Sequence, residues 1–281
     1  METVAKVISK NIASTTTQIL GSACKTCGEC GERIEAIINI LGKERKVPVM
    51  CKCREEEYNK QREVDRQKEK QRRLERLKEY SLMDKKFENC TFKNWKIDQE
   101  NQKWYEFGKK YCSSWQKMKE NNVGMLLWGV PGTGKTYLTS CIANELLSNF
   151  TPVIAISSIG LLNRIKETYK TYGQDGEVEI INSLKNASLL ILDDLGAENG
   201  TEWAKSKLYE IIDSRYRDGK PLIVTTNLTP QQLREKMTSA DGVTRTYDRV
   251  VEMCPPLEVK GNSKRVRYAV DKTQMLKELL D

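Results

Sequence analysis

The sequence contains no histidine, and this absence removes several kinds of functional site. Cys₂His₂ metal sites, Ser-His and Cys-His nucleophile pairs and histidine general bases are all excluded. No apolar run approaches the roughly 18 residues that a membrane helix needs. The first 21 residues are polar and hold no hydrophobic signal-peptide core. We therefore expect a cytoplasmic protein that does not associate with membranes and has no disulfide framework.

Charged residues are abundant in this sequence. Charged residues make up 31% of the 281 positions and the net charge is +8, which suits an anionic partner such as nucleic acid without identifying one. The length allows one substantial α/β domain plus a smaller module. From the composition we divide the chain into a Cys-rich segment at 1–53, a charged helical linker at 54–86 and a larger domain at 87–281.

The cysteines are concentrated in the first segment, which holds five of the nine. Cytosolic cysteine clusters are more often metal-binding or catalytic than disulfide-bonded. Cys24-x₂-Cys27 and Cys51-x-Cys53 flank a predicted hairpin, an arrangement similar to a zinc ribbon, and Cys30 is a fifth candidate ligand. A tetrahedral Cys₄ zinc site would fold a segment that is too small to be stable alone.

Local patterns describe the rest of the first two segments. Apolar spacing at 4–12 predicts a short amphipathic helix, and alternation at 34–40 predicts a strand that turns at Gly42 into a second short strand at 47–50. The linker carries charges of both signs, which favours an exposed spacer helix over a nucleic-acid surface. We expect its far end to dock onto the next domain through an apolar stripe of Leu74, Leu77, Met83 and Phe87.

The segment 87–281 alternates helical and strand patterns, which is typical of an α/β domain with a parallel sheet covered by helices. Short apolar runs of this kind, bounded by turn residues, indicate buried strands. We predict a five-stranded parallel sheet from the runs Met125–Trp128, Val153–Ser157, Leu189–Asp193, Leu222–Thr226 and Leu257–Val259.

The strongest motif is a phosphate-binding loop between the first of these strands and a helix pattern at 137–147. It matches G-x-x-x-x-G-K-[ST] in full, and its glycines allow several backbone N–H groups to face one anion at a helix N-terminus. Lys135 is predicted to reach the β- and γ-phosphates of ATP, and the Thr136 hydroxyl to bind Mg²⁺. The predicted nucleotide-binding residues of this loop are Gly129, Pro131, Gly132, Thr133, Gly134, Lys135, Thr136 and Tyr137.

Acidic and amide side chains follow two further strands. The apolar run at 189–192 ends in Asp193 and Asp194, which is the Walker B pattern. Asp193 is predicted to hold Mg²⁺ and Asp194 to orient the attacking water as a general base. Asn227 follows the strand at 222–226, where it can position that water. The alternative is that Asn227 only begins the turn that follows.

Two arginines lie four residues apart, so a helix would place them on one face. Neither Arg245 nor Arg249 has an obvious place in the chain's own phosphate site. In ring ATPases such an arginine reaches the γ-phosphate of a neighbouring subunit as a finger. The alternative is a surface ion pair with Asp248.

Together these residues resemble the DnaC/DnaI/IstB group of AAA+ ATPases. The resemblance is most specific in the blocks Asp193–Glu198, Leu208–Tyr216 and Thr225–Leu228, and it extends over about 87–270. Upstream, Phe87, Thr91-Phe92 and Trp95 are similar to the family's entry segment. Near the C-terminus, Gly261–Arg265 is similar to the G-x-S-x-R ending of the family.

The resemblance implies several residue roles. It makes Asp193 and Asp194 the Walker B pair, Asn227 sensor 1, Arg249 the finger and Arg265 a sensor-2-like residue. It also implies that Ser158–Lys170 is the extra helix of the initiator and loader clade, with single-stranded DNA contacts from Arg164, Lys166 and Lys170. By resemblance to zinc-bearing loaders, the favoured zinc ligands are Cys24, Cys27, Cys51 and Cys53.

The chain departs from the wider AAA+ pattern in two places. The second Walker B acid is Asp194 rather than glutamate, which suggests slow, switch-like hydrolysis. After the last strand we expect one short helix, at Thr273–Leu280, in place of a multi-helix lid.

The resulting hypothesis is an ATP-dependent loader of a hexameric replicative DNA helicase. It would use ATP, Mg²⁺ and Zn²⁺, contact single-stranded DNA and form an ATP-dependent homo-oligomer. The nearest alternative is an IstB-like transposition helper ATPase, which shares the same ATPase block. A small-molecule kinase is disfavoured because an acceptor lid is missing. A further alternative is an ATP-gated scaffold with little ATP turnover, because the side chain of Asp194 is one methylene shorter than that of glutamate.

Overall fold

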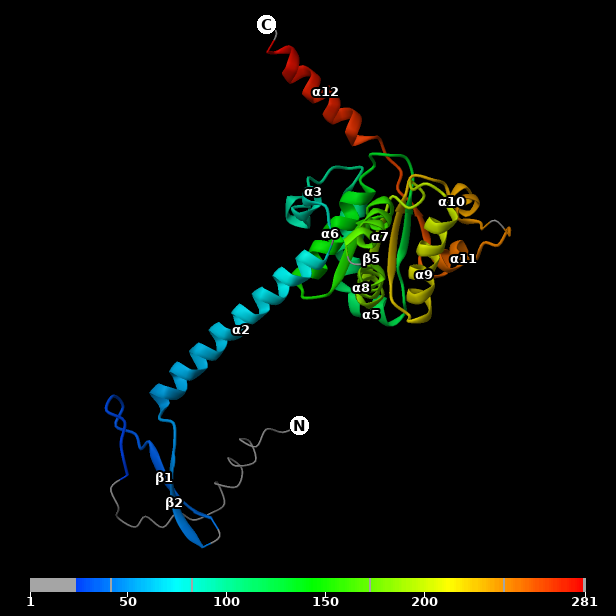
Figure 1. Cartoon of the computed structure of the whole chain (residues 1–281). Helices are drawn as coiled ribbons and strands as arrows, with labels where there is room; N and C mark the ends of the chain where they lie inside the picture. Colours follow the sequence, from blue (N-terminus) through cyan, green and yellow to red (C-terminus); the bar gives the residue numbers. More distant parts are fainter. Residues whose placement is uncertain (1–23, 41, 82, 172, 240, 280–281) are drawn as a thin grey trace. The chain divides into compact units, whose positions relative to one another are not determined.

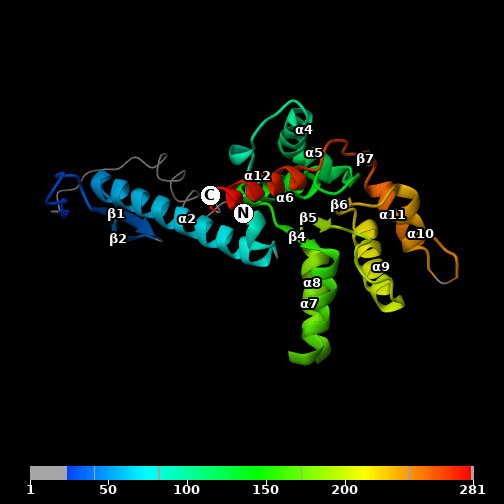
Figure 2. The same ribbon diagram turned by 90° about the horizontal axis from the view of Figure 1, so that it is seen from above.

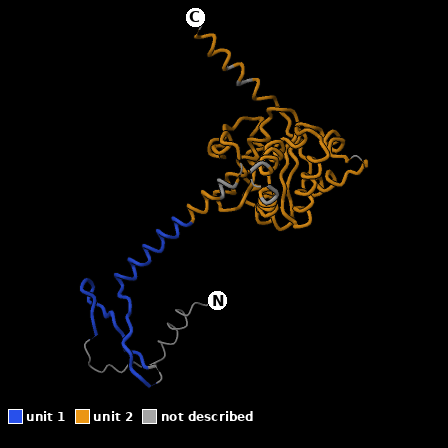
Figure 3. The backbone as a smooth tube through the Cα atoms, viewed as in Figure 1, with its two compact units in different colours: residues 1–69 blue, residues 70–281 orange. Residues whose placement is uncertain are grey.

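The computed structural model describes residues 24–40, 42–81, 83–171, 173–239 and 241–279. The chain forms two compact units, residues 1–69 and 70–281 (Figure 3), and the boundary lies inside the long helix α2, Lys52–Tyr80. The predicted helix at 4–12 lies outside the described residues. The predicted boundaries of the linker, at 53/54 and 86/87, stay predictions.

The first unit contains the predicted hairpin. Strands β1, Glu35–Ile40, and β2, Lys43–Pro48, pair antiparallel, with Glu35 opposite Pro48 and Ile40 opposite Lys43. The second strand therefore begins before the predicted start at 47. The reason is the turn, since Gly42 has φ +77° and a two-residue turn brings the chain into pairing at once.

Helix α2 has the exposed, charged character predicted for the linker. Its side chains bond along the helix at i, i+4 spacing, with Gln61 donating to Asp65 at 3.0 Å and Gln67 to Glu63 at 2.8 Å. Such pairs stabilise an isolated helix by a few tenths of a kcal/mol each, about 0.2–0.5. In the second unit, Leu74, Met83 and Phe87 pack against the core as expected, while the side chain of Leu77 is outside the described part.

The second unit is built on the predicted five-stranded parallel sheet, which the structure confirms (Figures 1 and 2). The strand order is β4-β5-β6-β3-β7, and every neighbouring pair is parallel. Four strands have the predicted bounds and the fifth is shifted by one residue. They are β3 (Met125–Trp128), β4 (Val153–Ser157), β5 (Leu189–Asp193), β6 (Leu222–Thr226) and β7 (Pro256–Glu258).

Helices cover both faces of this sheet because side chains alternate along each strand. Leu126, Leu190 and Val224 face one core layer, whereas Leu127, Ile191 and Ile223 face the other. The first layer is closed by α7 (Ser158–Thr171), α8 (Gly173–Asn186), α9 (Glu202–Arg217), α10 (Pro230–Met237) and α11 (Arg245–Met253). The second is closed by α4 (Gln102–Ser113), α5 (Trp115–Glu120) and α6 (Lys135–Ser148), with the short α3 (Lys85–Glu88) and the 3₁₀ helix at Phe92–Asn94.

A buried arginine lies at the amino ends of β5 and β6. Arg215 on α9 is fully buried, and its guanidinium donates to the carbonyl oxygens of Leu184 at 2.7 Å, Ala187 at 3.0 Å and Pro221 at 2.6 Å. Burial lowers its pKa to about 10, so it stays charged at neutral pH. The end of α8 and the approach to β6 are thereby held by one side chain, whose loss would leave several carbonyl groups unpaired.

The C-terminal helix differs from its prediction. Helix α12 spans Lys264–Lys277, so it begins well before the predicted start at Thr273. It begins early because the backbone N–H of Lys264 donates to the carbonyl of Gly132 at 3.0 Å, which anchors the start of the helix on the phosphate loop. None of the helices in the described ranges combines the length and the apolar character required to cross a bilayer.

Candidate nucleotide site and cysteine cluster

The phosphate loop joins the end of β3 to the start of α6, where the motif requires it. Gly129, Gly132 and Gly134 have φ values of +139°, +88° and +97°, which L-residues with a side chain rarely adopt. A Cβ at Gly132 would lie 2.2 Å from the Ser263 hydroxyl oxygen, so glycine is also required there by close approach. The loop therefore has its backbone turned inward over the N-terminus of α6.

Lys135 lies across this loop. Its ammonium donates to the carbonyl oxygens of Gly129 at 2.7 Å and Val130 at 2.9 Å, and to the Asn227 side-chain oxygen at 2.8 Å. Burial lowers the pKa of this lysine, against the opposing attraction of Asp194 and Asp193. Arg265 lowers it further, which places the predicted sensor-2 residue within electrostatic reach of the loop.

Asp193 ends β5 beside the first turn of α6. Its carboxylate accepts the Thr136 hydroxyl at 2.9 and 3.1 Å, and the Thr225 hydroxyl from β6 at 2.6 Å. Burial raises the pKa of this carboxyl, while the two hydroxyl donors act in the opposite direction. Thr136 and Asp193 are therefore adjacent oxygen groups of the kind that a magnesium ion prefers. No role for Thr225 could be predicted, because nothing in the sequence says which strand lies next to β5.

Asp194 and Asn227 meet above the same edge. Asp194 has φ +51°, and its carboxylate accepts the Asn227 amide at 3.0 Å. Asn227 thus bridges Lys135 and Asp194 through opposite ends of one amide. This is possible because β6 lies between β5 and β3 in the sheet, so the chain segment after β6 emerges between the two phosphate-site motifs.

Tyr137 faces an aromatic group on the entry segment. Its hydroxyl donates to the Asn94 carbonyl at 3.3 Å, and its ring lies 5.1 Å from that of Trp95 in an edge-to-face arrangement. The entry segment is therefore packed against the residue that follows the phosphate loop.

The two arginines of α11 are in different situations. Arg249 forms an ion pair with Asp213 and lies over two rings of α9, 5.0 Å from Tyr209 and 5.5 Å from Tyr216. Arg245 is exposed at the first residue of α11. The structure does not bring either arginine into the phosphate site of its own chain, as far as the described contacts reach.

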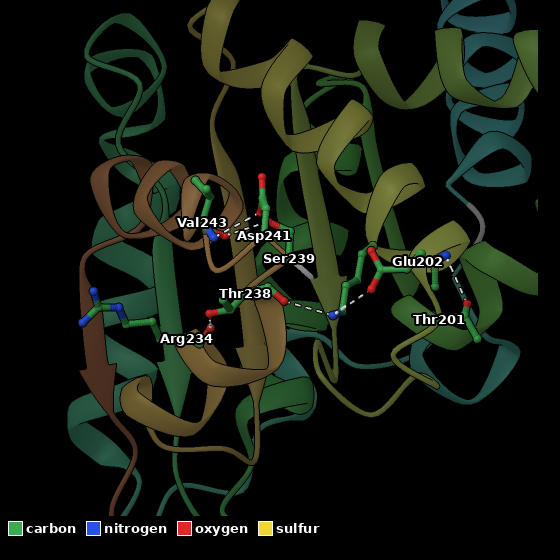
Figure 4. A network of polar contacts seen from close by, with 9 residues as sticks. Thr201, Glu202, Arg234, Thr238, Ser239, Asp241 and Val243 are labelled. Atoms are coloured by element: carbon green, nitrogen blue, oxygen red, sulfur yellow. Dashed lines mark hydrogen bonds and ion pairs between the residues drawn. The ribbon is translucent and has the colours of Figure 1, made fainter.

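The loop before α11 is held by a polar network (Figure 4). Lys205 on α9 contacts the Glu202 carboxylate at 3.2 Å and donates to the Thr238 carbonyl at 2.9 Å. The Ser239 hydroxyl and the Val243 backbone N–H both donate to Asp241. These contacts fix the approach to Arg245.

Helix α7 presents the basic residues predicted to contact DNA. Arg164 and Lys166 are exposed, and the Lys166 ammonium lies 5.0 Å from the Trp203 ring. Lys170 has its side chain outside the described part. The opposite face of the helix is buried through Leu161, Leu162 and Ile165.

The cysteine cluster requires a correction. The four thiols that lie within 4.8 Å of one another are Cys27, Cys30, Cys51 and Cys53, so Cys30 stands where Cys24 was predicted. The separations are 3.5 Å for Cys27–Cys53, 3.2 Å for Cys51–Cys53 and 3.5 Å for Cys30–Cys53. A tetrahedral Zn²⁺ site with Zn–S bonds of about 2.3 Å has sulfur atoms about 3.8 Å apart. The four thiols therefore fit a Cys₄ zinc site.

The reason for the correction is a tight turn after Cys27. The Gly31 N–H donates to the Cys27 carbonyl at 3.0 Å, and Gly31 has φ +70°, so the turn brings the Cys30 thiol back toward Cys27. Backbone N–H groups, first that of Cys30 and then that of Glu29, lower the pKa of the Cys27 thiol to about 6. The glycine after Cys30 is the sequence signal that could have selected it over Cys24.

Known proteins similar to this chain include replicative helicase loaders. Over 147 residues the chain is 27% identical to the replicative helicase loader DnaC of Escherichia coli strain K12, covering 52% of this chain and 58% of that one. The chain thus spans little more than half the length of the curated relatives it first matches.

Solved structures agree on the fold. The structure of the DnaC helicase loader aligns with a TM-score of 0.53 at 21% identity, over 63% of this chain and all of that one. The structure of DnaI aligns with a TM-score of 0.52 at 24% identity, over 64% of this chain and 93% of that one. Both likenesses show that these proteins share a fold with this chain.

The family pattern described as IstB-like ATP binding protein matches residues 50–271, which is most of the chain. The matched residues include the phosphate loop, Asp193, Asp194 and Asn227, and Asn227 joins Lys135 of the loop to Asp194. The chain belongs to the IstB-like ATP-binding protein family.

Proposed function

We propose that this protein is an ATP-dependent loader of a replicative DNA helicase, which binds and hydrolyses ATP and contacts single-stranded DNA. The observation that carries the proposal is the joined arrangement of Lys135, Asn227 and Asp194 beside the Thr136–Asp193 pair. The likeness to a replicative helicase loader supports the choice of partner.

Each residue of the nucleotide site has a proposed role. The loop backbone and Lys135 bind the phosphates of ATP, while Thr136 and Asp193 hold Mg²⁺, which neutralises charge on the phosphates when bound. Asp194 accepts a proton from, or orients, the attacking water, and Asn227 keeps that carboxylate in place. Arg265, the second residue of α12 and close to the loop, senses the bound phosphates. The protein forms an ATP-dependent homo-oligomer, in which an arginine of α11 completes the nucleotide site of a neighbouring subunit. Arg249 is the favoured arginine and Arg245 is the alternative.

Single-stranded DNA is proposed to bind along the exposed face of α7. Arg164 and Lys166 would neutralise backbone phosphates, since both are exposed on that face. The cysteine cluster is proposed to hold one zinc ion through Cys27, Cys30, Cys51 and Cys53, and the folded hairpin is proposed to bind the helicase.

Two variants test the ATPase. Lys135→Ala should abolish tight ATP binding, because it removes the mobile cation of the loop. Asp194→Asn should bind ATP with near-normal affinity and lose hydrolysis. Binding is measured with a fluorescent ATP analogue and hydrolysis by phosphate release. Equal ATP affinity of Lys135→Ala and the unchanged chain would show that the phosphate site is assigned wrongly.

A second candidate function is a transposition helper ATPase, which the IstB-like family match favours. The two functions differ in partner. Immobilised protein should capture a purified hexameric replicative helicase in the presence of ATP, and Lys135→Ala should show whether capture needs nucleotide. Capture of a transposase of the IS21 type, with no capture of helicase, would favour the alternative.

A further inference from the structure

A buried carboxylate lies outside the nucleotide site but close to it along the chain. Glu198 keeps only 8% of its exposure, and its carboxylate accepts the Ser158 hydroxyl at 2.6 Å and the Gly196 backbone N–H at 2.9 Å. An ionised carboxylate is costly to bury unless its oxygen atoms are bonded. The bond from Gly196 connects this carboxylate to the turn that follows Asp194, and the bond from Ser158 connects it to the start of α7.

This turn is held from the sheet side by β6. The Thr225 hydroxyl accepts the Asp194 backbone N–H at 2.9 Å, and the Thr226 hydroxyl donates to the Leu195 carbonyl at 2.6 Å. Asp194 itself has the left-handed value φ +51°, which residues with a side chain adopt infrequently, although aspartate tolerates it better than most. The direction of its carboxylate toward Asn227 depends on that backbone conformation.

The other side of the turn is held by α7. Ser158 is completely buried and is the first residue of that helix. Its hydroxyl lies 3.0 Å from the Asp194 carbonyl and 2.6 Å from the Glu198 carboxylate. The Lys236 ammonium donates to the Gly196 carbonyl from α10, which supplies a positive charge near the buried carboxylate.

We propose that Ser158 and Glu198 are a positioning pair that holds the Asp194 backbone in its left-handed conformation and links it to the first turn of α7. The inference rests on the proposed ATPase, because its effect is on hydrolysis. DNA bound along the exposed face of α7 would change the position of this helix. The Ser158 hydroxyl, which holds the Asp194 backbone, then moves with it. Hydrolysis is thereby made sensitive to what α7 binds.

The test separates hydrolysis from binding and from folding. Ser158→Ala and Glu198→Ala should each lower kcat about tenfold, which corresponds to one lost hydrogen bond at the transition state. The affinity for a fluorescent ATP analogue should change less than twofold, because neither side chain contacts the phosphate loop. The double variant should lose little more than either single variant, since both act through one contact. Ser158→Thr keeps the hydroxyl and should restore most of the activity.

Ser157→Ala is the matched control. The Ser157 hydroxyl accepts the Gly160 N–H at 3.1 Å, so this variant weakens the start of α7 without touching the turn at 194–198. It should lower the thermal midpoint but leave kcat within twofold. If Ser157→Ala lowers kcat as much as Ser158→Ala, or if Ser158→Ala keeps the kcat of the unchanged chain, the positioning pair is refuted. If the unchanged chain binds ATP and does not hydrolyse it, the proposed ATPase fails, and this inference fails with it.

Discussion

Arg249 is the predicted finger, yet in the single chain it is already bound to Asp213. Breaking a fully buried ion pair by removing one partner costs about 3–5 kcal/mol. The side chains here keep 21% and 16% of their exposure, so we expect about 2 kcal/mol from the ion pair in Arg249→Ala. The contacts with the Tyr209 and Tyr216 rings add about 0.5–1 kcal/mol. The thermal midpoint should therefore fall by roughly 5–10 °C.

Thermal melting of purified variants measures this cost, and Arg245→Ala is the control. Arg245 is exposed, so its loss should change the free energy of unfolding by no more than about 0.5 kcal/mol. If Arg249 must leave Asp213 to reach a neighbouring subunit, a second prediction follows for variants of Asp213. Asp213→Asn should lower stability as Arg249→Ala does, but it should keep or raise ATP turnover, because it releases the guanidinium.

Mixing experiments complete the test. Arg249→Ala and Lys135→Ala, each inactive alone, should partly recover turnover when combined, since some interfaces then join an intact loop to an intact arginine. A structural role alone predicts that Asp213→Asn loses turnover in parallel with Arg249→Ala, and that mixing restores nothing. If mixed assembly is verified independently, that result would refute Arg249 as the finger. Arg245 would then be the next residue to test. An unchanged thermal midpoint in Arg249→Ala would refute the energetic reasoning.

Three further predictions follow from other parts of the chain. Elemental analysis should find about one zinc per chain, lost in Cys30→Ser and retained in Cys24→Ser, and the reverse pattern would restore the ligand set first predicted. Arg215→Met should lower the free energy of unfolding by about 3 kcal/mol or more in denaturant titration, because buried carbonyl groups lose their donor, and a loss below about 1 kcal/mol would contradict this. The hydrogen bond and ion pair with Lys264, at 2.9 Å, lower the pKa of Asp98. Its contribution to stability is therefore present above the unfolded-state pKa and is lost as pH falls through the lower folded-state value, so Asp98→Asn and the unchanged chain should differ in melting at pH 7 and converge in acid.

Much of the second unit could be predicted from the sequence, because its signals are local. A buried parallel strand is a short apolar run, so four of the five strands have the predicted bounds. The phosphate loop could also be predicted from the sequence, since its three glycines have positive φ values that few other residues adopt. The exposed helix α2 follows from its composition alone.

Contacts between distant segments could not be read in this way. Nothing local says that β6 lies between β5 and β3, and this order is what brings Asn227 between Lys135 and Asp194. In the same way, Asp213 is separated from Arg249 by a strand and a helix, so their ion pair appears only when α9 and α11 pack.

The cysteine cluster shows both sides of this division. The sequence by itself determined that thiols of the first segment gather across a hairpin, because their spacing and the strand pattern are local properties. Which four gather was decided by the turn at Gly31, whose conformation brings Cys30 and not Cys24 to the other three. Likewise, the sequence determined that Asp194 follows the end of a strand, whereas only the tertiary structure placed the buried Ser158 and Glu198 around it. The physical reason is that local patterns report which residues are buried, while the partner of a buried polar group depends on how the layers of the fold meet.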